Sequence, residues 1–455
     1  MSRYYDKIMK KSIVIIVLAA LVVHVFLFSG LRFTAWPEML SYPYLRNNGF
    51  LLYKDMIHPY PPVLTMVLSI IYKLLGYKLI VLKVFTWLII LVNDVLIFLI
   101  VKKMVNSERW AVISVIFYVL IQPFLEGNQL WFDLAIVPFI LLSTYCILQK
   151  KFFWSGLFLG VAILTKQTVG LYLVFGILYI AYRERNFKKV LLFLLGPAVL
   201  FLVLLFRLIT EGALSGFLNW TLIYPFTWWS KFPGYVQMVL TRRDIVILVL
   251  LVLPAILLIL KLRRNFFREK SILLTTFCLL LSFVLVYPRF SFFHLQLGIA
   301  FCAIFYSVFL SKFKFSYILH LISYILLFWF ICLPVLKSDW GKETRFWGNE
   351  DIKVAELIKN STKPDDLIFL LGPHSGLYVL SGRLPPKPWA DNFAWYLEIP
   401  GVQDEIIKRW EGKIPKVVFT NNIQEGNWYD LGTYRPKKIV DWIRNEKIIQ
   451  IILSE

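Results

Sequence analysis

The sequence predicts a polytopic α-helical membrane protein with about eleven transmembrane helices and a small outer α/β domain at its carboxyl end. Hydrophobic residues make up 59% of the 455 positions and aromatic residues 17%, well outside the range of soluble globular proteins. The charge is also unevenly divided, because residues 1–336 hold 32 basic and 11 acidic residues whereas residues 337–455 hold 17 of each. We therefore expect a transmembrane domain at 1–336 and a separate outer domain at 337–455.

The net charge of +21 belongs wholly to the membrane part of the chain. Basic cytoplasmic turns and anionic lipid headgroups account for such an excess. A basic protein that binds nucleic acid would carry its charge on a soluble face with a recognisable reading module, and the sequence contains none. The expected partner is the lipid bilayer, with no nucleic acid.

The first span sets the topology. Four basic residues within 2–11 precede the apolar run 13–28, which lacks a small-residue cleavage site, so we expect an uncleaved span with a cytoplasmic amino end. The loop 32–78 is then external. Ten further spans are expected at 79–101, 110–123, 130–148, 152–164, 169–182, 190–209, 245–260, 271–287, 293–310 and 317–336, which places the carboxyl-terminal domain outside the cell membrane.

The segment Val63–Leu75 is apolar but short for a crossing, and Lys73 and Lys78 flank its end. We expect a helix that lies in the outer interface. Treating this segment as a span would move every basic turn to the outer side, which the positive-inside rule disfavours.

The outer domain shows the short apolar runs of a mixed α/β fold. Helices are expected at 351–359, 403–410 and 437–444, and strands at 367–371, 416–420 and 448–453.

Six of the eleven acidic residues in the membrane part fall at its outer boundary. Such a group could form a carboxylate cluster beneath the external loop, or each member could be an isolated charge at the level of the headgroups. Asp94, beside Asn93 within the second span, is either functional or a polar partner inside the bundle. The six outer residues are Glu38, Asp55, Glu126, Asp133, Glu211 and Asp244.

Outer cationic groups form the complementary set. Lys166 lies in the tight turn TKQTVG, and Arg289 and His294 lie five residues apart in YPRFSFFHLQ. Charged donors suit an anionic phosphate. The alternative is ordinary anchoring at the interface among the neighbouring aromatic residues.

These stretches together resemble the GT-C superfamily of polyprenyl-phosphate-sugar glycosyltransferases, in particular bacterial relatives of protein O-mannosyltransferases and the lipid A aminoarabinose transferase. The resemblance rests on one span, an external loop with an acidic residue, and a many-span body with an outer α/β tail. Its motifs are Gly49 with Tyr53 and Asp55, the pair Pro61 and Pro62, the Leu-Leu-Gly at 74–76, the Thr-Lys-Gln at 165–167, and Pro288 to His294.

The resemblance implies an inverting transfer of a sugar from a polyprenyl-phosphate donor to an acceptor hydroxyl on a glycan, lipid or protein at the outer surface. It identifies Glu38 with the family's catalytic acid. Such a transfer needs a carboxylate that takes the acceptor's proton and cations that hold the leaving phosphate.

We hypothesise that either Glu38 or Asp133 is the catalytic base. The other residue of this pair would orient the acceptor or a divalent metal, and both of these roles stay open. In this hypothesis, Lys166, Arg289 and His294 bind the donor phosphate, and Tyr53, Asp55 and His58 serve as acceptor contacts or as structural residues of the loop.

Two other classes compete with an enzyme: a multi-span transporter or flippase of a lipid-linked glycan, and a non-enzymatic assembly protein. Transporters tend to place charges near the midplane in repeated halves, whereas here only Asp94 is clearly at mid-depth among the acids and no halves match. An enzyme should gather its outer charged residues around one cavity.

Overall fold

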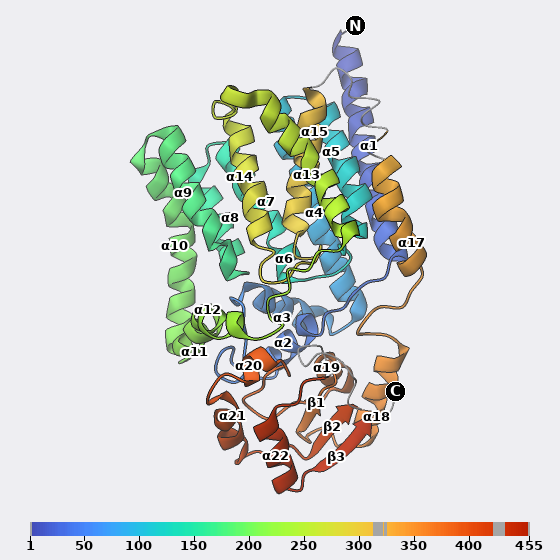
Figure 1. Ribbon diagram of the computed structural model, residues 1–455, viewed down its shortest axis with the longest axis vertical. Helices are drawn as coiled ribbons and strands as arrows, with labels where there is room; N and C mark the ends of the chain where they lie inside the picture. Colours follow the sequence, from blue (N-terminus) through green and yellow to red (C-terminus); the bar gives the residue numbers. More distant parts are fainter. Residues whose placement is uncertain (1, 313–321, 323–324, 422–432, 454–455) are drawn as a thin grey trace. The chain divides into compact units, whose positions relative to one another are not determined.

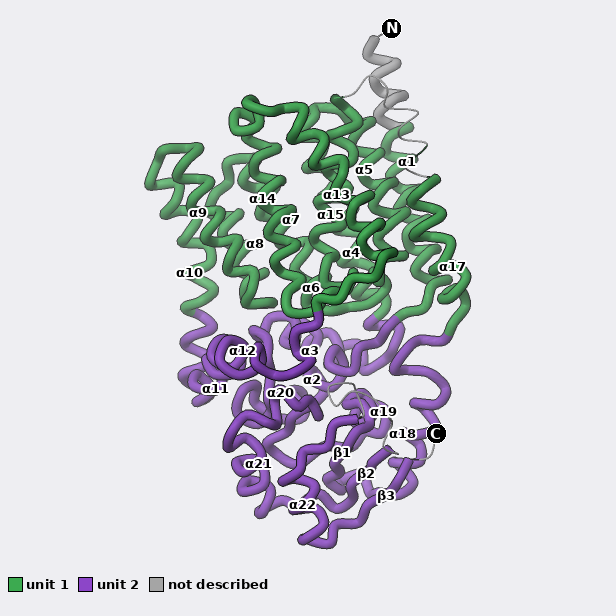
Figure 2. Tube along the Cα trace, in the orientation of Figure 1, with its two compact units in different colours: residues 1–33, 83–202, 238–342 green, residues 34–82, 203–237, 343–455 purple. Residues whose placement is uncertain are grey.

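The structure is a computed structural model that describes residues 2–312, 322, 325–421 and 433–453. The chain forms two compact units, each built from three separate segments (Figure 2). Unit 1 comprises residues 1–33, 83–202 and 238–342, and unit 2 comprises residues 34–82, 203–237 and 343–455.

The described part of unit 1 is helical (Figure 1). Its helices follow the sequence-predicted spans closely, although the first turn of α4 and the end of α10 belong to unit 2. They are α1 (Ser2–Gly30), α4 (Leu79–Val105), α5 (Glu108–Ile121), η1 (Gln122–Phe124), α6 (Phe132–Ala135), α7 (Val137–Leu148), α8 (Phe152–Ile163), η2 (Gln167–Val169), α9 (Gly170–Glu184), α10 (Phe187–Thr210), α13 (Arg242–Leu262), η5 (Arg263–Asn265), α14 (Lys270–Val284), α15 (Gln296–Ser311), η6 (Phe328–Cys332) and α17 (Leu333–Asp339).

Four stretches among the described residues are long and apolar enough to cross a membrane: Ser12–Gly30, Leu79–Val105, Phe187–Thr210 and Arg242–Asn265. Shorter apolar helices occupy other sequence-predicted spans, and much of the last one, 317–336, lies outside the described residues. The prediction of a mostly helical membrane protein is thus confirmed, and the figure of eleven crossings stays a prediction.

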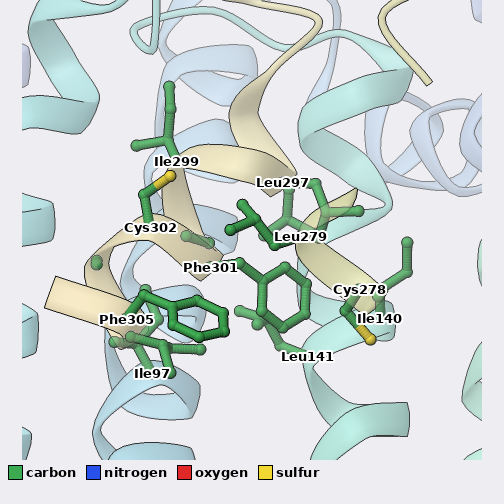
Figure 3. Packing of buried hydrophobic residues seen from close by; sticks show 14 of the residues in the cluster. Ile97, Ile140, Leu141, Cys278, Leu279, Leu297, Ile299, Phe301, Cys302 and Phe305 are labelled. Atoms are coloured by element: carbon green, nitrogen blue, oxygen red, sulfur yellow. The ribbon is translucent and has the colours of Figure 1, made fainter. Parts of the chain in front are cut away.

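Helix α15 forms the centre of unit 1. Every residue from Gln296 to Leu310 is buried, as expected of a helix that is apolar on all sides. In Figure 3, Phe301 and Phe305 of this helix pack among residues of α4, α7 and α14. The ends of these helices are therefore held in place by a closely packed core.

Unit 2 combines loop helices with a small sheet. Strands β1 (Ile368–Leu371), β2 (Val417–Asn421) and β3 (Ile449–Leu453) are parallel and ordered β1-β2-β3, with Ile368 opposite Val417 and Val417 opposite Ile449. The helices are α2 (Glu38–Asn47), α3 (Val63–Leu75), α11 (Leu214–Leu218), η3 (Asn219–Ile223), α12 (Tyr224–Thr227), η4 (Trp229–Lys231), α18 (Asn349–Asn360), α19 (Gly376–Ser381), α20 (Ala394–Leu397), α21 (Val402–Trp410) and α22 (Lys437–Asn445).

The helices and strands predicted for the carboxyl-terminal domain are confirmed to within two residues at each end, as is a helix at Val63–Leu75. The loop 32–78 and the carboxyl-terminal tail are also joined by backbone contacts within unit 2. Thr34 pairs with Arg345, and Ile57 donates its backbone N–H to the carbonyl of Trp389 at 2.8 Å. These contacts bring residues of the first loop next to residues more than 300 positions later.

Candidate active site

In unit 1, three sequence-predicted site residues meet around the buried Asp133 carboxylate. Its Oδ1 lies 2.5 Å from Nζ of Lys166, and its Oδ2 lies 2.9 Å from Nδ1 of His294. Asp133 lies in the first turn of α6, which follows the extended Trp131, Lys166 directly precedes η2, and His294 lies just before α15. The Lys166 ammonium group and the His294 ring on either side of this buried carboxylate compensate its charge.

Arg289 lies half-buried in the same connection as His294, between α14 and α15. Glu126 fixes this connection, because its carboxylate accepts hydrogen bonds from the Ser291 hydroxyl and, at 3.0 Å, from the Phe293 backbone. The structure thus assigns Glu126 a structural contact.

In unit 2, Glu38 opens α2 directly after Pro37, whose fixed φ suits the start of a helix. Glu38, Ser41 and Tyr42 lie on one face of the helix, spaced three and four residues apart, and all three are buried. This face meets the turn that follows β1, where the hydroxyl groups of Ser41 and Ser375 lie 3.1 Å apart.

Asp391 lies beside Glu38, although the sequence reasoning did not select it. Ser375 and Tyr42 both hydrogen-bond to the Asp391 carboxyl. The two carboxyl groups line one cavity of about 20 Å³, which is enough for a single water molecule or hydroxyl group. Its described lining residues are Pro37, Glu38, Gly372, Pro373, His374, Ser375, Asp391, Asn392 and Phe393.

Four buried polar atoms on residues that line this cavity have no hydrogen-bond partner among the described residues: Glu38 Oε2, Asp391 Oδ2, Asn392 Oδ1 and His374 Nδ1. The other ring nitrogen of His374 lies 2.8 Å from Asp351 Oδ1, which favours the tautomer whose Nδ1 is a bare acceptor. Several unsatisfied acceptors among these four atoms favour a proton donor inside the cavity, such as a hydroxyl group.

Burial raises the pKa of Glu38 well above its usual range, and the neighbouring Asp391 raises it further. Burial also raises the pKa of Asp391, although its hydrogen bonds with Ser375 and Tyr42 limit the effect. Two adjacent buried carboxyl groups resist carrying two negative charges, so near neutral pH they share one proton.

Asp55 is held in an ionic cluster of unit 2. Its carboxylate lies 3.4 Å from Nζ of Lys387 and 3.3 Å from Nη2 of Arg409, and it accepts the backbone N–H of Leu51 at 3.1 Å. Arg409 also donates to the carbonyl of Lys54 at 2.8 Å. These contacts favour the structural alternative for Asp55, because its oxygens are already engaged.

His58 and Tyr53 likewise stabilise the loop from inside. His58 is fully buried, with Nδ1 2.6 Å from the carbonyl of Tyr60 and Nε2 2.8 Å from the Thr65 hydroxyl. Burial lowers the pKa of His58 to about 4, so the ring is neutral at physiological pH. The Tyr53 hydroxyl donates to the same Tyr60 carbonyl at 2.7 Å.

The described residues do not form a cluster of side chains typical of a metal site. Within the described ranges, no group of three His, Cys, Asp or Glu side chains lies close enough to hold a metal ion.

Comparisons with known proteins concern the fold of the chain. A family model described as dolichyl-phosphate-mannose-protein mannosyltransferase matches residues 58–209. Among solved structures, ArnT from Cupriavidus metallidurans in the apo state superposes with a TM-score of 0.59 at 14% identity, covering 83% of this chain and 85% of ArnT. The chain resembles the GT-C glycosyltransferases. The resemblance predicted from the sequence is thereby confirmed.

Two further GT-C structures carry lipid phosphates. ArnT from the same organism bound to undecaprenyl phosphate gives a TM-score of 0.53 at 14% identity, over 97% of this chain and 89% of ArnT. The oligosaccharyltransferase AglB from Archaeoglobus fulgidus, in complex with an inhibitory peptide and a dolichol-phosphate, gives 0.56 at 10% identity. That match covers 83% of this chain but only 64% of AglB. A search of curated proteins finds no match.

Proposed function

We propose that the chain is an inverting glycosyltransferase that moves a sugar from a polyprenyl-phosphate donor to an acceptor hydroxyl at the outer membrane surface. The observation that carries the proposal is the buried Glu38 carboxyl, which has an unpartnered oxygen at a cavity of hydroxyl size in a chain of GT-C fold. The undecaprenyl phosphate of ArnT and the dolichol-phosphate of AglB support a lipid-phosphate donor. The acceptor is a glycan, lipid or protein that bears a free hydroxyl.

In the proposed reaction, Glu38 is the general base. The acceptor hydroxyl reaches Oε2 of Glu38 and gives up its proton as its oxygen attacks the anomeric carbon of the donor sugar. The bond from this carbon to the phosphate oxygen breaks with its electron pair, so the anomeric configuration inverts. Polyprenyl phosphate leaves as an anion and needs no separate acid.

The surroundings of the two candidate bases favour Glu38 over Asp133. Both oxygens of Asp133 are engaged at 2.5 and 2.9 Å by Lys166 and His294, and a carboxylate paired in this way is a poor proton acceptor. Glu38 has an unpartnered oxygen, and its raised pKa makes its ionised form a stronger base.

Lys166, Arg289 and His294 are the proposed ligands of the donor phosphate. Asp133 contacts two of them and would hold their side chains in place before the donor arrives. Cationic donors stabilise the negative charge that develops on a leaving phosphate, and preorganisation avoids rearrangement during the reaction.

The test is a transfer assay with the purified full chain in lipid vesicles. A polyprenyl-phosphate hexose labelled in the sugar is supplied with an extract of cell-envelope acceptors. We expect labelled acceptor and free polyprenyl phosphate in equal amounts, and NMR of the product should show the anomeric configuration opposite to that of the donor. Movement of intact donor across the vesicle membrane without cleavage would instead support the flippase alternative.

A further inference from the structure

Unit 2 holds a second, larger cavity that shares no lining residue with the Glu38 cavity. Its volume is about 250 Å³, which is enough for several water molecules or a headgroup. It lies where the end of α2 and the following turn meet α3 and the last turns of α10, all within the purple unit of Figure 2. Its described lining residues are Arg46, Asn47, Gly49, Phe50, Leu51, Leu52, Tyr53, Pro62, Met66, Lys73, Leu204, Arg207, Leu208 and Glu211.

The charge of this cavity is positive. Arg46, Lys73 and Arg207 contribute three cations, and among the described lining residues the acid is Glu211. Arg207 donates from Nε to Glu211 Oε1 at 2.8 Å, which compensates one of these charges. Burial lowers the pKa of Arg46 and the nearby charge of Arg207 lowers it further, whereas Glu211 and Tyr77 act in the opposite direction without cancelling this decrease. Two guanidinium groups that repel each other at one cavity favour an anion between them, and guanidinium pairs well with phosphate.

The cavity is also partly apolar. Met66, Leu204 and Leu208 supply hydrophobic side chains beside the two arginines. Arg207 directs a second nitrogen at the Met66 sulfur, 3.4 Å away, so its guanidinium is held against this wall. A ligand that fits would combine an anionic group with hydrocarbon.

The exposed side chains of α3 and of the end of α10 indicate that such a ligand comes from the membrane. On α3, Val67, Ile70 and Leu74 are exposed, and on the end of α10 so are Phe206 and Ile209. In a membrane protein, exposed apolar side chains of this kind contact lipid. The positive cavity therefore lies on helices that also carry lipid-facing residues.

We propose that this cavity binds the phosphate group of a membrane lipid, with Arg46 and Arg207 as the phosphate ligands and the acyl chains along α3 and the end of α10. The site would hold a bound lipid at the external loop, independently of Glu38 and of the sugar transfer. Lys73, which is exposed, adds to the attraction without being a required ligand.

The experiment measures lipid binding to the purified full chain by native mass spectrometry. Phosphatidic acid is compared with diacylglycerol of the same chains, since the two differ only in the phosphate. We expect phosphatidic acid to bind at least roughly tenfold more tightly, because hydrogen bonds to a charged group are the stronger class. Equal binding of the two lipids would overturn the proposal, and so would inorganic phosphate binding as tightly as phosphatidic acid.

Variants locate the site. Arg46→Gln breaks no ion pair recorded among the described residues and should weaken phosphatidic acid binding roughly tenfold. Arg207→Lys keeps a charge beside Glu211 but loses the planar guanidinium, so it should weaken binding less. Arg444→Gln, an exposed change on α22, is the matched control and should leave binding unaltered. Unchanged binding in Arg46→Gln, with the protein monodisperse, would place the lipid elsewhere and refute the assignment.

Discussion

At Glu38, burial outweighs the preference of a helix amino end for an ionised carboxylate. Its place in the first turn of α2 favours the ionised form, because the amino end of a helix carries partial positive charge. Burial and the neighbouring Asp391 act in the opposite direction and prevail, so the pKa of Glu38 rises. The base that we propose is thus made stronger by a residue from the carboxyl-terminal part of unit 2.

Asp391→Asn tests this influence through the pH profile. The charge of Asp391 raises the pKa of Glu38, so its removal should lower that pKa and increase the ionised fraction of Glu38 in acid. We expect the acid limb of transfer rate against pH to move by about one unit to lower pH, because burial, the larger cause, remains.

The control for this variant is Asp365→Asn, at an exposed position of unit 2. Its acid limb should coincide with that of the wild type. A reduced rate in Asp391→Asn with an unmoved limb would mean that Asp391 serves the fold alone.

The sequence alone could predict part of the candidate site. Lys166, His294 and Asp133 were all expected at the outer boundary, and in unit 1 they meet. Asp391 could not be found, because it is one of 17 acidic residues in a charge-balanced tail and its contact with Glu38 spans more than 350 positions. Linear patterns report local structure, whereas such pairings depend on the tertiary fold.

At the scale of elements, close helix packing depends on glycines in α8. A Cβ on Gly156 would lie 1.8 Å from the carbonyl oxygen of Phe193 on α10, and one on Gly160 would lie 2.8 Å from the Cα of Pro197. Small residues four apart let membrane helices approach closely.

The sequence patterns predicted individual helices and strands most accurately. The bounds of α3 and of the strands of the tail were predicted nearly to the residue.

Gly156→Ala should force α8 and α10 apart. Overpacking of this kind costs roughly 1–3 kcal/mol, so the midpoint of thermal unfolding in detergent should fall. Gly170→Ala is the matched control, because a Cβ there meets no atom within 4 Å. A midpoint for Gly156→Ala equal to that of Gly170→Ala would contradict the close packing of these helices.

For the molecule as a whole, the proposed function depends on the membrane topology. The basic turns predict a cytoplasmic amino end and an external carboxyl-terminal domain, on the side where we propose that a polyprenyl-phosphate donor meets its acceptor. The four native cysteines are buried, so engineered cysteines can report on exposure with little background.

We expect a membrane-impermeant maleimide to label Glu411→Cys on intact cells and Lys188→Cys only after the cells are broken. Both positions are exposed, so they differ chiefly in the side of the membrane to which they are assigned. Labelling of Lys188→Cys on intact cells would show that the chain has the opposite orientation in the membrane, so that Glu38 would not lie at the outer surface.

Glu38 is the proposed base of the transfer, and the transfer rate of the Glu38→Gln variant tests this role. The substitution keeps the size of the side chain but removes its ability to take a proton. Because a general base contributes roughly 10²- to 10⁴-fold, the transfer rate from a polyprenyl-phosphate sugar should fall by that factor. Glu356→Gln, an exposed change on α18, should retain the wild-type rate. A well-folded Glu38→Gln protein with undiminished transfer would show that Glu38 is not the base.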